Sequence, residues 1–159
     1  PIATVTSAFV NMILTFIVVF GVVIIAGRGI HIHAMLCLPI VMIVEYILCL
    51  GIGLIVSSIT VYLRDLQYIL GIFVMALQYL TPVMYGVDMV ENSGAGYWLV
   101  FLFNLNPMTP IIRIYRQIIY YGEVPELHSL LLALIVGIVF IVIGEVMFKK
   151  LQKGFAEEF

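Results

Sequence analysis

Few side chains in this sequence have the types and spacing of a catalytic or metal site. It contains no GxxxxGK[ST] phosphate loop, no HExxH helix and no GxSxG nucleophile turn. Cys37 and Cys49 lie in apolar runs with no histidine between them, which matches no metal spacing and does not indicate a disulfide framework. His31 and His33 could bind a metal weakly, but a solvated loop is the favoured interpretation. We therefore predict no catalytic residue, no metal site and no cofactor held by this chain, as expected of a transporter or channel.

One acidic residue, Glu45, falls inside a long apolar run. A carboxylate within a membrane costs about 3 kcal/mol on insertion scales, so it needs a partner or a polar lining. A protonated, hydrogen-bonded Glu45 is the favoured interpretation, and a proton relay is the alternative. On the same segment Gly53 and Ser57 form a small-xxx-small pair, which would let another helix approach closely. Glu145 lies one turn before Lys149, a spacing that predicts an i,i+4 ion pair.

A polar and aromatic stripe runs along one side of residues 66–86. At 3.6 residues per turn these side chains fall within about one third of the helix circumference. They are Gln67, Tyr68, Gly71, Met75, Gln78, Tyr79 and Pro82. Inside a membrane such a stripe faces protein or a water-filled path. Two interpretations stay open: packing against a neighbouring helix through the glutamines, or the lining of a translocation path.

The composition places these segments in a membrane. Of 159 residues, 64% are hydrophobic and 10% are charged, and the mean hydropathy is +1.23. Soluble domains have about 45–50% apolar and about 25% charged residues, so a soluble fold is excluded, and disorder is excluded by the high hydrophobicity. The net charge of −2 provides no basic surface for nucleic acid. We predict an all-α integral membrane protein.

Four segments are apolar enough to cross the membrane as helices, which takes about 20 residues each. The predicted spans are residues 5–27, 34–62, 66–86 and 128–148. A fifth apolar stretch, residues 97–122, contains the turn residues Asn106, Pro107 and Pro110. Prolines break a helix, and freed backbone groups facing lipid are costly. We therefore predict an external re-entrant pair of short helices, with a fifth, kinked span as the alternative.

With this topology both ends of the chain lie on one side of the membrane. That side would carry Arg64, Lys149, Lys150 and Lys153, and the other side Arg28, Arg113 and Arg116. The small excess favours cytoplasmic ends. The aromatic residues Tyr97, Trp98, Tyr115, Tyr120 and Tyr121 would form a belt on the outer side. The first residue is Pro and no charged n-region precedes the first span, so we expect the C-terminal piece of a longer protein and no signal peptide.

Several short motifs, taken in order, resemble the ABC-2-type exporter permeases. The run VYLRDLQ at 61–67 resembles the junction between the fourth and fifth membrane helices of that family, and TPVMY at 81–85 resembles the end of its fifth helix. LNPMTP at 105–110 resembles the turn between its two external re-entrant helices, and the tail from Phe148 to Ala156 resembles its C-terminal ending. The branch it resembles most exports lipid-linked polysaccharide: O-antigen, capsule or teichoic acid.

The resemblance implies a six-helix permease, of which residues 1–159 would be a single membrane domain carrying helices three to six. It also implies a second permease copy, a separate ABC ATPase subunit that binds ATP and Mg²⁺, surrounding membrane lipid, and a lipid-linked glycan substrate moved across the bacterial cytoplasmic membrane. The family places helix 66–86 beside the conduit, so Tyr68 and Tyr79 would stack on sugar rings while Gln67 and Gln78 offer exchangeable hydrogen bonds. Glu45 belongs to no motif of the family.

Three other functions remain open at this stage. One is a drug or small-lipid exporter of the same superfamily, and a second is a structural assembly subunit without transport. The third is a membrane enzyme of polysaccharide assembly, for which Arg113 and Arg116 are the only candidate residues. They have no acidic partner nearby in the sequence, so the enzyme is disfavoured.

Overall fold

The computed structural model describes residues 2–25, 32–62, 65–81 and 97–155. Every regular element within these ranges is a helix. Three of them are long and apolar enough to cross a membrane: α1 (Ile2–Ile25), α3 (Leu38–Tyr62) and α8 (Leu127–Phe155). The prediction of an all-α integral membrane protein is confirmed.

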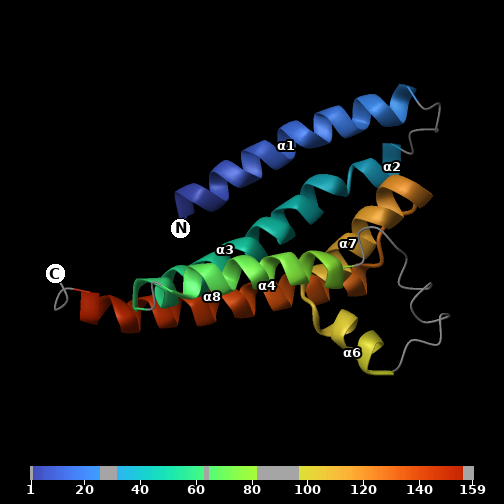
Figure 1. The fold of residues 1–159 in the computed structure, drawn as a ribbon. Helices are drawn as coiled ribbons and strands as arrows, with labels where there is room; N and C mark the ends of the chain where they lie inside the picture. Colours follow the sequence, from blue (N-terminus) through green and yellow to red (C-terminus); the bar gives the residue numbers. More distant parts are fainter. Residues whose placement is uncertain (1, 26–31, 63–64, 82–96, 156–159) are drawn as a thin grey trace.

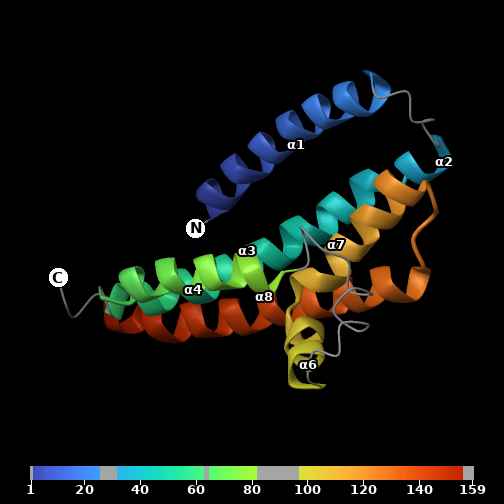
Figure 2. The same ribbon diagram turned by 45° about the vertical axis from the view of Figure 1, so that its right-hand side comes forward.

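The long helices run in alternating directions (Figures 1 and 2). α1 and α4 (Leu66–Leu80) run one way, while α3 and α8 run the other and lie side by side along most of their length. The short α2 (Ile32–Met35) leads into α3 at the end of the bundle opposite the start of α1. None of the residues of α1 is buried, so this helix lies on the outside of the described fold.

The helix α4 is shorter than a full membrane crossing. Its 15 residues span about 22 Å at 1.5 Å per residue, against a hydrocarbon thickness of about 30 Å. It ends where Thr81 adopts an extended conformation, with φ −92° and ψ 124°, because a residue that precedes proline is disfavoured in the helical region. The rest of the predicted span 66–86, residues 82–86, lies outside the described ranges.

The segment with the two prolines is divided into two short helices. α6 (Tyr97–Leu105) ends just before Asn106, and α7 (Met108–Arg116) begins after Pro107 and continues into the π-helix η1 (Gln117–Tyr121). Pro110 lies in the first turn of α7, where its missing N–H leaves no intrahelical bond unmade. The predicted break in the helix is therefore present, and we call α6, α7 and η1 the hairpin.

Gly122 ends the hairpin in a left-handed conformation, with φ 68°. Glycine reaches this region without the steric cost that a Cβ adds. The backbone N–H of Glu123 donates to the carbonyl oxygen of Gln117 at 3.0 Å, which closes the last turn. The chain then enters α8.

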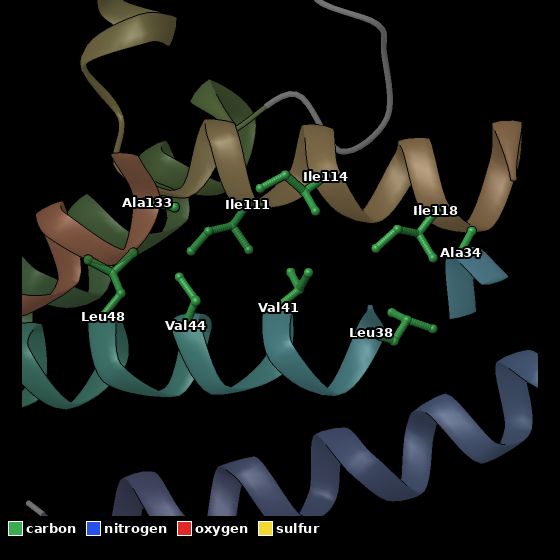
Figure 3. Packing of buried hydrophobic residues seen from close by; sticks show 9 residues of the cluster. All are labelled: Ala34, Leu38, Val41, Val44, Leu48, Ile111, Ile114, Ile118 and Ala133. Atoms are coloured by element: carbon green, nitrogen blue, oxygen red, sulfur yellow. The ribbon is translucent and has the colours of Figure 1, made fainter. Parts of the chain in front are cut away.

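The buried core lies between α3 and the hairpin, as Figure 3 shows. One stripe on α3 faces a stripe of equal spacing on α7 and η1, and Ala34 and Ala133 close the cluster from α2 and α8. The two stripes consist of Leu38, Val41, Val44 and Leu48 on α3, and Ile111, Ile114 and Ile118 on the hairpin. Spacings of three and four residues place each set on one helix face.

Glycine allows α3 and α8 to touch backbone to backbone. A Cβ added at Gly51 of α3 would lie 2.6 Å from the backbone nitrogen of Ile141 and from the carbonyl carbon of Phe140. On α8, a Cβ at Gly144 would lie 2.9 Å from the carbonyl oxygen of Gly51. Helix pairs in membranes gain van der Waals contact through such small residues. The Gly53 position predicted for close packing faces α1 instead, with a Cβ 3.2 Å from Cγ2 of Val5.

Candidate functional site

Part of the predicted polar stripe borders one hollow on α4. This hollow has a volume of about 480 Å³ and is lined by Gln67, Tyr68, Gly71, Ile72 and Met75. Tyr68 is 78% exposed, and a Cβ added at Gly71 would meet nothing within 4 Å. The structure therefore brings four of the seven stripe residues to one open surface, which we call the α4 hollow.

The other stripe residues lie farther along the same helix. Gln78 is exposed, and the Tyr79 side chain is 77% exposed. Pro82 lies outside the described residues.

A second hollow joins α4 to the two preceding long helices. Its volume is about 630 Å³, and it is lined by Thr4, Val5, Gly53, Val56, Ser57, Thr60, Gln67 and Leu70. Polar side chains from α1, α3 and α4 therefore line one hollow. The Thr60 hydroxyl donates to the carbonyl oxygen of Val56 at 2.6 Å, the bond back to the same helix that Ser and Thr make in membranes.

The turn of the hairpin is bonded to the end of α4. The amide nitrogen Nδ2 of Asn106 donates to the hydroxyl of Thr81 at 2.9 Å, and that hydroxyl donates to the carbonyl oxygen of Leu77 at 2.7 Å. The side-chain oxygen Oδ1 of Asn106 accepts the backbone N–H of Met108 at 3.0 Å, which satisfies a free donor at the start of α7. Asn106 is only 7% exposed. The predicted turn residue thus caps one helix and holds another.

The buried Thr109 fixes the angle between the two halves of the hairpin. Its hydroxyl donates to the carbonyl oxygen of Phe103 at 2.6 Å, so the last turn of α6 is tied to the first turn of α7. Arg113 lies farther along α7 and donates to the side-chain oxygen of Asn104 at 3.3 Å. These bonds make α6 and α7 one unit.

The intramembrane carboxylate has a partner in the hairpin. The hydroxyl of Tyr115 donates to Oε2 of Glu45 at 2.6 Å, and both side chains are half-buried. The Tyr115 ring also packs on Phe16 of α1, with ring centroids 5.3 Å apart. We call the Glu45–Tyr115 pair the clasp, because it joins α3 to α7 close to α1. Tyr115, which the sequence predicts in an outer aromatic belt, thus also contacts α3 and α1.

A third cavity lies beside the clasp, between α1 and α3. It measures about 310 Å³, and its lining consists of Val5, Ala8, Phe9, Met12, Glu45, Tyr46 and Cys49. Tyr46 holds α1 at this point: its hydroxyl lies 2.9 Å from the Thr6 hydroxyl, and its ring centroid lies 4.9 Å from that of Phe9. Polar and aromatic contacts therefore secure α1, whose own residues are not buried.

The described residues contain no cluster of three or more His, Cys, Asp or Glu side chains able to hold a metal ion. The predicted ion pair between Glu145 and Lys149 is confirmed, with Oε1 and Nζ 2.6 Å apart on an exposed face of α8. Both side chains are more than half exposed, so the pair adds little stability.

Sequence reasoning missed the clasp, although a signal for it exists. Glu45 directly follows Val44 of the α3 core stripe, and Tyr115 directly follows Ile114 of the α7 stripe. Two apolar stripes of equal spacing that pack face to face bring residues at the same edge of each stripe together. The match becomes visible only when the two stripes are known to be partners.

Comparison with known proteins gives a consistent result. Residues 2–120 match the family described as ABC-2 type transporter. An "O-antigen export system permease protein RfbA" of Klebsiella pneumoniae is 25% identical over 157 residues, which cover 99% of this chain and 58% of that protein. A protein of the same name from Myxococcus xanthus is 26% identical over 119 residues, 75% of this chain and 45% of that protein.

A second K. pneumoniae protein of this name is 27% identical over 120 residues, which cover 76% of this chain and 44% of that protein. The chain thus spans about half the length of the curated relatives it matches. No solved structure matches the chain.

Proposed function

Because the chain belongs to the ABC-2 type transporter family, we propose that it is part of the permease subunit of an ATP-driven exporter of lipid-linked polysaccharide. The proposed substrate class is that named for its relatives, O-antigen, or a similar glycan of the capsule or teichoic acid type. The proposed location is the bacterial cytoplasmic membrane.

The proposed topology has four membrane crossings and an external re-entrant hairpin. α1, α3 and α8 are long enough for three crossings. The predicted span 66–86, of which α4 is the described part, would be the fourth. The alternating directions of these four helices support this arrangement (Figure 1). So does the helix break at Asn106, because two short helices joined by a bonded turn can enter and leave on one side.

The proposed assembly is a pair of permease copies with a separate ABC ATPase subunit. ATP and Mg²⁺ would bind to that subunit, since the sequence has no phosphate loop. The membrane part would then supply the path and no chemistry.

The observation that carries the proposal is the composition of the α4 hollow. An exposed tyrosine, a glutamine and a glycine share an open surface on a helix whose other side is apolar. Aromatic rings stack on the apolar faces of sugars without demanding one sugar identity, and the glutamine exchanges hydrogen bonds as the chain moves. A path of weak, repeated contacts suits a long polymer, because tight binding at one point would halt it.

The test compares two aromatic residues on different faces of α4, about 120° apart around the helix. Tyr79→Ala removes a ring from the polar stripe, and Phe73→Ala removes one from the apolar arc; both rings are more than half exposed. In the assembled exporter, Tyr79→Ala should lower the rate at which glycan reaches the cell surface by about tenfold or more. Phe73→Ala should leave that rate unchanged.

Expression, permease pairing and ATP hydrolysis are measured in parallel. If Tyr79→Ala separates the two permease copies, the stripe is a packing surface and the path assignment fails. Equal export by the two variants would also contradict it.

A further inference from the structure

The helix α4 has little burial, and a hydrogen bond from the hairpin turn reaches its C-terminal end. None of its described side chains is buried, so apolar packing within the chain fixes it weakly. Its C-terminal end is tied to the hairpin turn by the Asn106–Thr81 hydrogen bond. The position of the proposed path helix therefore depends on where the hairpin lies.

The hairpin is in turn anchored at a second point along α7. The Tyr115 hydroxyl donates to Glu45 of α3 at 2.6 Å, and the apolar stripe of α7 packs on the stripe of α3. Asn106 and Tyr115 are nine positions apart in the sequence, about 13 Å along a helix. One short helix thus bridges from the end of α4 to the first third of α3.

We propose that α7 is a strut which sets the position of α4 relative to α3, and that the Glu45–Tyr115 clasp is its anchor within the membrane. Glu45 and Tyr115 are then positioning residues for transport. The proposal rests on the proposed function only where export is measured, because the strut itself is a property of the fold.

The chemistry of the clasp explains why a carboxyl group lies within α3. Removal of one partner of a buried hydrogen bond lowers stability the most, because the other polar group is left unsatisfied. Replacement of both partners by apolar groups of similar shape is far less harmful. If Glu45 and Tyr115 interact, the stability losses caused by the two single substitutions are therefore non-additive.

The experiment is a double-mutant cycle on the complete exporter with its ATPase subunit. Tyr115→Phe removes the donor and keeps the ring that packs on Phe16. Glu45→Leu removes the acceptor, and the double variant removes both. Glu45→Gln retains an amide oxygen that can accept from Tyr115. Tyr121→Phe, which removes the hydroxyl of a half-exposed tyrosine in the same hairpin, is the matched control.

Two quantities are measured: the melting temperature of the purified complex without substrate, and the glycan exported per ATP hydrolysed. Each single apolar variant should lower the melting temperature by about 2–4 °C and the export per ATP by about fivefold. For both quantities, the decrease in the double variant should be clearly smaller than the sum of the decreases in the two single variants. Glu45→Gln should keep most of the parent's melting temperature and export per ATP, and Tyr121→Phe should have the parent's values of both.

The results that overturn the strut are specific. Additive melting losses would show that Glu45 and Tyr115 do not interact. Coupled melting losses with unchanged export per ATP would show that the clasp is only structural. If the parent complex exports no glycan, the proposed function fails, while the melting-temperature cycle still decides whether the clasp exists.

Discussion

Among the described glycines, Gly51 leaves the least room for an added Cβ, and this sets a sharp expectation for a single methyl group. A Cβ at this position would lie 2.6 Å from two backbone atoms of α8 and 2.7 Å from Cβ of Phe140. Carbon atoms pack favourably at about 3.5–4.0 Å. The backbone of α8 cannot rotate away as a flexible side chain can, so Gly51→Ala must push the two helices apart by about 1 Å.

The cost follows from the contacts that this separation weakens. A radial gap of about 0.5–1 Å forfeits a quarter to a half of each van der Waals well, and overpacking in a core typically costs about 1–3 kcal/mol. We expect Gly51→Ala to destabilise the protein by about 2 kcal/mol. At about 2–4 °C per kcal/mol, the melting temperature in detergent should fall by about 4–8 °C.

Gly71→Ala is the matched control, since it makes the same chemical change on α4. A Cβ at Gly71 would meet nothing within 4 Å, and alanine is favoured over glycine in a helix interior by about 1 kcal/mol. Its melting temperature should equal or exceed that of the parent. If the Gly51→Ala protein has the same melting temperature as the parent, the close contact of α3 with α8 is refuted.

Two further predictions concern the topology and the turn. Cysteines introduced at Lys150 and Ser93 in a background without Cys37 and Cys49 should be labelled from opposite sides of the membrane by an impermeant maleimide, and labelling of both from outside would contradict four crossings with a hairpin. Asn106→Asp keeps the acceptor for the Met108 N–H but loses the donor to Thr81, whereas Asn106→Ala loses both. Loss of a helix cap costs about 1 kcal/mol of stability, so the melting temperature should fall further for Asn106→Ala than for Asn106→Asp. Glycan export per ATP should fall for both variants.

The parts of the fold set by local physics could be predicted from the sequence. The long apolar runs became α1, α3 and α8 because a helix satisfies its backbone hydrogen bonds within its own segment, as a membrane requires. The break at Asn106 follows from the prolines beside it, and the Glu145–Lys149 pair follows from helical spacing. Each of these depends on residues within a few positions of one another.

The contacts that depend on distant residues could not be predicted. Glu45 and Tyr115 are 70 positions apart, and a single sequence does not state which helices are neighbours. The same limit explains the glycines on α3. The small-residue spacing correctly marked Gly53 as a place of close approach, but Gly51, two positions away and on another face, makes the tighter contact.

The exposure of α4 bears on which of the two interpretations of its stripe is favoured. Gln67 fits both interpretations, because it borders the α4 hollow and also a hollow shared with polar residues of α1 and α3. Packing within the described fold does not account for Tyr68, which borders the open α4 hollow and is 78% exposed. A phenolic hydroxyl facing hydrocarbon without a partner is costly, so this side of α4 requires either a protein surface with matching polar groups or a polar path. A second permease copy would supply such groups at fixed positions. The path that we propose relies instead on the glycine and the flexible methionine beside Tyr68, which leave room for a changing occupant.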